Sequence, residues 1–90
     1  MNIRDEIGAM CPEALFLKED KYDAAILGLG ERFGGVEAVV YDSQMILAIL
    51  EEEFGDMDDA IEWYEYNILG AWLGERTPIF VTLVKREGHD

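Results

Sequence analysis

The sequence predicts one small α+β domain, residues 1–90, with a ββααβ order in which a three-stranded antiparallel sheet packs on a two-helix hairpin. Three observations predict this fold class. Two apolar stretches flank a Gly-Gly pair, apolar residues then recur every three or four positions, and a proline precedes a last apolar stretch. With 50% hydrophobic residues, the 90-residue chain suits one folded domain and differs from a disordered acidic tail, which is poor in aromatic residues.

The N-terminal part of the chain shows no clear periodicity, and we expect an irregular segment over residues 1–23. Pro12 would break a helix that begins at Ile3, because proline lacks the backbone N–H that a helix interior needs. A β-hairpin is predicted over residues 24–41, since apolar residues alternate on both sides of Gly34-Gly35. Two glycines can adopt the positive φ angles that a tight hairpin turn requires.

A helical hairpin is predicted over residues 42–73. Asp42 or Ser43 is a good N-cap for the first helix, and Gly55 sits where a left-handed C-cap belongs. Asp56 then caps the second helix. The apolar positions expected to face the core are Ile46, Ile49, Leu50 and Phe54 in the first helix, and Met57, Ala60, Ile61, Tyr64, Ile68, Ala71 and Trp72 in the second.

Pro78 opens a third predicted strand over residues 78–84, and a polar tail follows over residues 85–90. Both faces of this strand are apolar, with Ile79, Val81 and Leu83 on one face and Phe80 and Val84 on the other. The helices cover one face of the sheet, so the face that carries Phe80 needs a second cover. Two covers are compatible with the sequence: the apolar segment Leu15–Leu17 of the same chain, or a second copy of the chain in a homodimer.

Negative charge is concentrated in the predicted helical hairpin. The chain carries 20 acidic and 7 basic residues, a formal net charge of -13, which argues against direct binding of nucleic acid or of an anionic membrane surface. The last turn of the first helix holds Glu51, Glu52 and Glu53, where the helix dipole disfavours negative charge and no internal counter-ion is expected. Residues 42–62 contain eight acids and no base: Asp42, Glu51, Glu52, Glu53, Asp56, Asp58, Asp59 and Glu62.

Such a cluster works against local stability, and it is therefore a candidate partner-binding surface. The alternative is that the charge only keeps the protein soluble. On the second helix, Asp58, Glu62 and Glu65 are spaced i, i+4 and i+7 and form a line of carboxylates about 10 Å long. A row of this kind can imitate a phosphate backbone and compete for a basic groove.

Two aromatic residues, Trp63 and Tyr66, lie beside this line of carboxylates. They are either core residues or anchors of a protein interface, where tryptophan and tyrosine are enriched. The predicted partner-binding residues are Glu51, Glu52, Glu53, Asp56, Asp58, Asp59, Glu62, Glu65, Trp63 and Tyr66.

We expect no catalytic, cofactor or metal site. His89 is the only histidine and falls in the predicted tail, and the acidic run from Asp56 to Ala60 lacks the glycine and the distant glutamate of a calcium loop. Cys11 is the only cysteine, so no intramolecular disulfide is expected and a reducing compartment fits best. The N-terminus has no apolar signal segment, and we expect a soluble cytoplasmic protein that is not an enzyme.

The segment from Phe54 to Val81 resembles a pattern in small accessory proteins of bacteriophages and prophages. Glu65-Tyr66-Asn67, Gly70-Ala71-Trp72 and Thr77-Pro78 carry the resemblance, as parts of an acidic "EYNxxGAWxGExTP" segment. The residues from Tyr22 to Gly34 resemble the preceding part of those proteins. The resemblance implies a phage-encoded accessory protein that acts in the host cytoplasm. Such proteins include anti-CRISPR inhibitors that occlude nucleic-acid sites, but the resemblance transfers no functional residue.

Two functions therefore follow as hypotheses. In the first, the chain is an acidic inhibitor and nucleic-acid mimic that binds a host defence protein, a CRISPR effector above all, and blocks its basic nucleic-acid-binding surface. In the second, it is a small dimeric structural or assembly module whose acidity is only solubilising. A metal-dependent enzyme that uses the acidic hairpin is a third and less favoured alternative.

Overall fold

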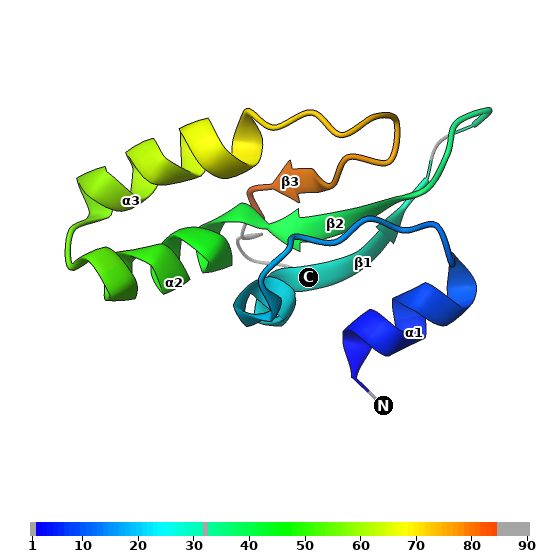
Figure 1. The fold of residues 1–90 in the computed structure, drawn as a ribbon, viewed down its shortest axis with the longest axis horizontal. Coiled ribbons are helices and arrows are strands. Elements are labelled where there is room, and N and C mark those ends of the chain that lie inside the picture. The colour runs from blue at the N-terminus through cyan, green and yellow to red at the C-terminus, as the bar shows by residue number, and fades with distance from the viewer. Residues whose placement is uncertain (1, 32, 85–90) are drawn as a thin grey trace.

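The β-hairpin and the helical hairpin are the two units around which the chain folds (Figure 1). The computed structural model describes residues 2–31 and 33–84, so the predicted tail 85–90 with His89 lies outside the described residues. The elements in chain order are α1 (Ile3–Met10), the 3-10 helix η1 (Asp20–Ala25), β1 (Ile26–Gly30), β2 (Ala38–Asp42), α2 (Ser43–Phe54), α3 (Met57–Tyr64), the π-helical turn η2 (Glu65–Leu69) and β3 (Ile79–Val81).

The three strands form one mixed sheet in the order β1-β2-β3. β1 and β2 pair antiparallel, which confirms the predicted hairpin. The prediction of a tight turn at Gly34-Gly35 is wrong, because seven residues separate the end of β1 at Gly30 from the start of β2 at Ala38. β3 pairs parallel to β2, with Ile79 opposite Val40 and Val81 opposite Asp42. The α+β class is therefore confirmed, whereas the prediction of a wholly antiparallel sheet is wrong at the third strand.

An additional chain reversal before β3 explains the parallel pairing. α2 continues in the direction of β2, α3 returns beside α2, and the loop of residues 70–78 then turns the chain back toward the sheet (Figure 1). Gly74 has a φ angle of 105°, in the left-handed region that favours glycine. The Thr77 hydroxyl donates to the Gly74 carbonyl (2.6 Å) and accepts from the Leu73 N–H (2.7 Å). A helix that ran to residue 73, as predicted, would leave no room for this turn.

The N-terminal segment contains a helix, in contrast to the irregular structure predicted for it. The Asn2 side chain accepts a hydrogen bond from the Asp5 N–H (2.9 Å) and caps α1, and Ile7 buries its side chain in the core. α1 ends at Met10, just before Pro12. The proline therefore ends this helix rather than preventing it.

One face of the sheet holds the core. Tyr41 of β2 is fully buried and stacks on Phe80 with 5.7 Å between ring centroids, and Phe80 meets Tyr64 of α3 edge-on at 5.9 Å. The Leu17 N–H donates to the Tyr41 hydroxyl (2.9 Å), so segment 15–17 packs on the same face. Segment 15–17 is therefore present as the first of the two predicted covers for the face of Phe80. Tyr64 of α3 contacts the same face, so the expected separation of this face from the helices is wrong.

The opposite face of the sheet is the more open one. Ile79 is 45% exposed there, and its β2 neighbour Val40 is half-buried. Beyond the strand, Leu83 and Val84 are exposed. The homodimer was predicted through the face of Phe80 rather than through this one, and it stays a prediction.

Candidate protein-binding surface on the helical hairpin

Capping residues fix both helices of the acidic hairpin. The Asp42 side chain accepts from the Gln44 N–H (3.0 Å), so Asp42 rather than Ser43 is the N-cap of α2. Gly55 has a φ angle of 75° and ends α2 as a left-handed C-cap. The Asp56 side chain accepts from the Asp58 N–H (3.2 Å) and begins α3. The predicted cap positions of this hairpin are confirmed, and they hold the two helices on a short link.

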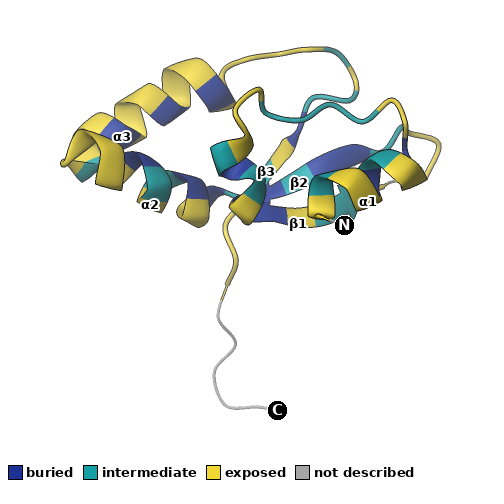
Figure 2. Cartoon of the chain, turned by 60° about the horizontal axis from the view of Figure 1, so that its bottom comes forward, coloured by how far each residue is buried: buried dark blue, intermediate teal, exposed yellow. Residues whose placement is uncertain are grey.

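The buried positions of α3 and η2 determine which residues face outward. Ala60, Tyr64 and Ile68 recur at every fourth position and are buried. Figure 2 shows buried segments alternating with exposed ones along α3. Because an α-helix repeats every 3.6 residues, the positions between them face solvent. The interpretation of Trp63 and Tyr66 as core residues is wrong, since they are 37% and 79% exposed. All ten predicted partner-binding residues are exposed: Glu51, Glu52, Glu53, Asp56, Asp58, Asp59, Glu62, Trp63, Glu65 and Tyr66.

A π-helical turn ends the second helix earlier than predicted. The Gly70 N–H donates to the Glu65 carbonyl (3.0 Å), five residues back, as in a π-helix. A Cβ atom at position 70 would lie 2.9 Å from that same carbonyl oxygen, so only glycine fits without a shift. Beyond this turn, Ala71 and Trp72 are exposed and do not continue the apolar stripe predicted for them.

The helical hairpin carries a groove lined by aromatic and acidic residues, which we call the aromatic groove. Its volume is about 420 Å³. The Phe54 and Trp63 rings meet edge-on with 6.1 Å between centroids, and the Asn67 side-chain amide donates to the Trp63 carbonyl (3.0 Å). The groove is lined by Phe54, Asp59, Glu62, Trp63, Tyr66 and Asn67. Four of the ten predicted residues are thus brought together in one place.

The three glutamates at the end of α2 do not act as one cluster. Glu51 and Glu52 line a separate shallow hollow beside Ala48. Glu53 instead pairs with Lys21 of η1, with 2.5 Å between Oε2 and Nζ, and this hydrogen bond raises the pKa of the Lys21 ammonium. The expectation that no internal counter-ion serves these glutamates is therefore wrong for Glu53.

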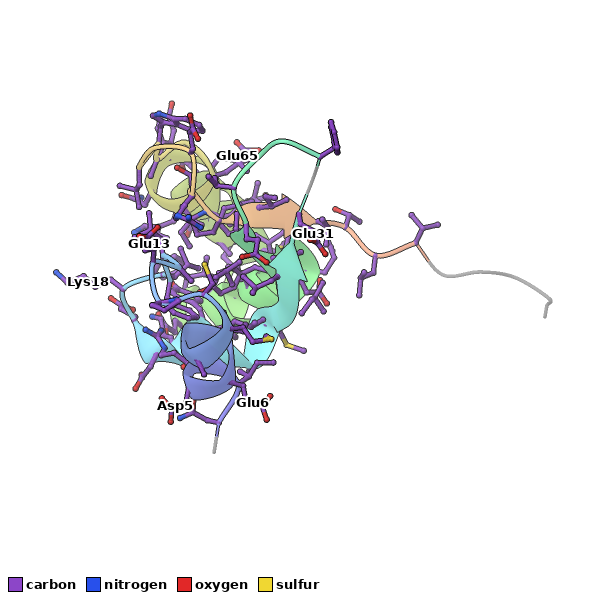
Figure 3. All side chains as sticks on the ribbon, turned by 90° about the vertical axis from the view of Figure 1, so that its right-hand side faces the viewer. Asp5, Glu6, Glu13, Lys18, Glu31 and Glu65 are labelled. Carbon is purple, nitrogen blue, oxygen red and sulfur yellow. The ribbon has the colours of Figure 1, made fainter. Side chains whose placement is uncertain are left out.

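The predicted line of carboxylates is exposed but only partly joined to the aromatic groove. Asp58 and Glu65 do not line the groove, whereas Glu62 does. Glu65 begins the π-helical turn, and Figure 3 shows it near α3 while Asp5 and Glu6 lie at the far end of that view. The line therefore extends the acidic surface on both sides of Glu62.

Two groove residues, Phe54 and Asn67, were absent from the predicted site. Phe54 was assigned to the core because of its helical spacing, yet its side chain is 40% exposed. Because Phe54 directly precedes the C-cap Gly55, it is the last residue of α2. This position in the sequence is the signal that its side chain extends beyond the core. Asn67 follows Trp63 by four residues, which is the spacing at which helical side chains meet.

Residues 2–31 and 33–84 also bear on metal binding and on membrane insertion. That part of the chain contains no group of three or more His, Cys, Asp or Glu side chains arranged to hold a metal ion. None of its helices combines the length and apolar character needed to cross a membrane. Cys11 is buried, and the Arg76 guanidinium approaches its Sγ (3.3 Å) while pairing with Glu13 (2.9 Å). These contacts join the N-terminal segment to the loop before β3.

The helical hairpin thus combines a capped backbone, exposed carboxylates and exposed aromatic rings. Charge and apolar area of this kind suit contact with a basic protein surface. Comparison of the chain with family models, curated proteins and solved structures finds no match. The interpretation of this surface therefore depends on its own residues.

Proposed function

We propose that the protein is a non-enzymatic, acidic binding protein that docks its helical hairpin on a basic nucleic-acid-binding surface of another protein. Docking there blocks the access of nucleic acid. The surface consists of the outward sides of α2 and α3 together with the aromatic groove.

One observation carries this proposal. Residues 42–62 hold eight acids and no base, and within the described part of the chain only Glu53 among them has an ion-pair partner. Asp42 and Asp56 have a structural task as N-caps. The other carboxylates form neither an ion pair nor a capping hydrogen bond among the described residues, so their charge remains available to a partner.

The electrostatics favour a protein partner over nucleic acid itself. A net charge of -13 repels phosphate, and the same charge attracts a Lys- and Arg-rich groove from a distance. Because helices hold the backbone that carries the carboxylates, docking requires no ordering of this backbone. The aromatic groove adds apolar contact area that a purely solubilising surface would not need.

We propose a host defence protein as the target, and a CRISPR effector as its first candidate. The resemblance of the Phe54–Val81 segment to phage and prophage accessory proteins supports this choice. The protein would then act in the host cytoplasm.

A displacement assay tests this function. A labelled oligonucleotide is bound to purified CRISPR effectors of several types, and its release is followed by fluorescence anisotropy as the protein is added. We expect release from at least one effector, and an affinity that weakens steeply as salt rises, because exposed charges are screened within about 8 Å at physiological ionic strength. If no effector of the panel binds the protein and none releases its oligonucleotide, the proposed target class is contradicted.

The dimeric structural module remains as a second candidate, because Ile79 is 45% exposed on the open face of the sheet. Light scattering at micromolar concentration distinguishes it from the first. A dimer that persists at high salt and dissociates in an Ile79→Lys variant would support the module. A monomer under all conditions would contradict it.

A further inference from the structure

We infer that the aromatic groove is a recognition site for an arginine side chain of a basic partner. The inference rests on the proposed function and deepens it, because it names the group that the acidic hairpin recognises. It also assigns a role to Phe54 and Asn67, which lie outside the predicted site.

The lining of the groove offers an arginine side chain both aromatic surface and carboxylate acceptors. Phe54, Trp63 and Tyr66 provide aromatic surface, against which an arginine can stack its planar guanidinium. Asp59 and Glu62 provide carboxylates, and neither has an ion-pair partner among the described residues. A carboxylate can accept two parallel N–H bonds from one guanidinium.

Asn67 supplies a further acceptor. Its amide nitrogen donates a hydrogen bond to the Trp63 carbonyl (3.0 Å). This bond orients the side chain and leaves the amide oxygen as the available acceptor. The amide oxygen has no hydrogen-bond donor within residues 2–31 and 33–84, and it can accept from the guanidinium. Tyr66 and Asn67 both belong to the π-helical turn, a feature that is frequent at functional sites.

Other occupants fit this lining less well. A nucleotide base could stack on the rings, but its phosphate would then face Asp59 and Glu62. A purely apolar segment would leave both carboxylates desolvated without a partner. Lysine carries the right charge, but its compact ammonium cannot stack as a plane or form a two-pronged bond. Charge complementarity together with the aromatic lining therefore selects arginine.

Short synthetic peptides test this inference without any knowledge of the target. Three peptides with blocked termini are compared. In each of them glycine alternates with one other residue, which is arginine, lysine or citrulline. Citrulline keeps the shape of arginine and removes its charge. Binding is followed by the fluorescence of Trp63 in a Trp72→Phe background, which removes the signal of the other tryptophan.

Matched variants separate local recognition from net charge. Glu62→Gln removes one charge inside the groove, and Glu6→Gln removes one charge from the exposed side of α1, outside the helical hairpin. We expect the arginine peptide to change the Trp63 fluorescence, the lysine peptide to bind several-fold more weakly, and the citrulline peptide not to bind. Glu62→Gln should weaken arginine binding about fivefold, while Glu6→Gln changes it less than twofold. Trp63→Phe keeps an aromatic ring beside Phe54 and should retain measurable binding by calorimetry.

Two results would overturn the inference. Equal binding of the arginine and lysine peptides, with equal losses in both variants, would show attraction by net charge alone. Absence of any Trp63 response to the arginine peptide would show that the groove does not receive the side chain. Both results leave the displacement assay intact, so failure of this inference is distinguishable from failure of the proposed function.

Discussion

Replacing both Glu51 and Glu52 by glutamine should stabilise the fold. Both carboxylates lie in the last turn of α2, both are exposed, and neither has an ion-pair partner among the described residues. Relief of the unfavourable helix-dipole interaction contributes about 0.3–1 kcal/mol for each residue. The double variant should therefore gain about 0.6–2 kcal/mol in the free energy of unfolding, which for a domain of this size raises the melting temperature by roughly 2–16 °C.

Glu53→Gln is the matched control. It relieves the same dipole interaction, but it also removes the ion pair with Lys21. The side chain of Lys21 is 33% exposed and that of Glu53 is 42% exposed. A pair this exposed contributes about 0.2–1 kcal/mol, so the two effects offset each other and the stability should change little.

Denaturant titration at 25 °C measures these differences at low salt and again at 1 M salt, where charges are screened within about 3 Å. The gain of the double variant should be largest at low salt and should nearly vanish at 1 M. A double variant less stable than the parent would refute the reasoning, as would a Glu53→Gln gain equal to half that of the double variant.

Three further predictions concern the core, the link between the helices and the response to alkali. Ile46→Ala removes a fully buried side chain and should lower the free energy of unfolding by about 2–5 kcal/mol in denaturant titration. Gly55→Ala places a Cβ in the left-handed region and should lower it by about 1 kcal/mol in the same titration; an unchanged midpoint would contradict the cap assignment. Stability should fall as pH rises above about 10, because burial raises the pKa of Tyr22, Tyr41 and Tyr64 in the fold, so the unfolded chain loses these protons first. A denaturation midpoint that stays constant through tyrosine ionisation, followed by absorbance, would contradict it.

Local signals in the sequence predicted most of the elements. The caps Asp42, Gly55 and Asp56 and the β-hairpin are correct because short-range chemistry determines them. The direction of β3 depends on the loop closed by Gly74 and Thr77, whose side-chain hydrogen bonds have no periodic pattern to reveal them. α1 was missed because Pro12 follows the helix instead of interrupting it.

The candidate surface was predicted in composition but not in arrangement. Charge counting found the acids, since exposed acids need no tertiary context. Pairing across the fold could not be inferred, because Lys21 and Glu53 are 32 residues apart. The aromatic groove likewise depends on the contact between Phe54 of α2 and Trp63 of α3, which only the packed hairpin creates.

The most direct test of the central claim compares two triple variants of equal charge in the displacement assay. One replaces Asp58, Glu62 and Glu65 on the hairpin by Asn, Gln and Gln. The other replaces Glu6, Glu31 and Glu75, which are exposed residues outside the hairpin, by Gln. If the hairpin binds a basic nucleic-acid site, the first variant should displace the oligonucleotide about tenfold less well than the parent, and the second less than twofold. Equal losses in the two variants would contradict the claim and leave the charge as a general property of the surface.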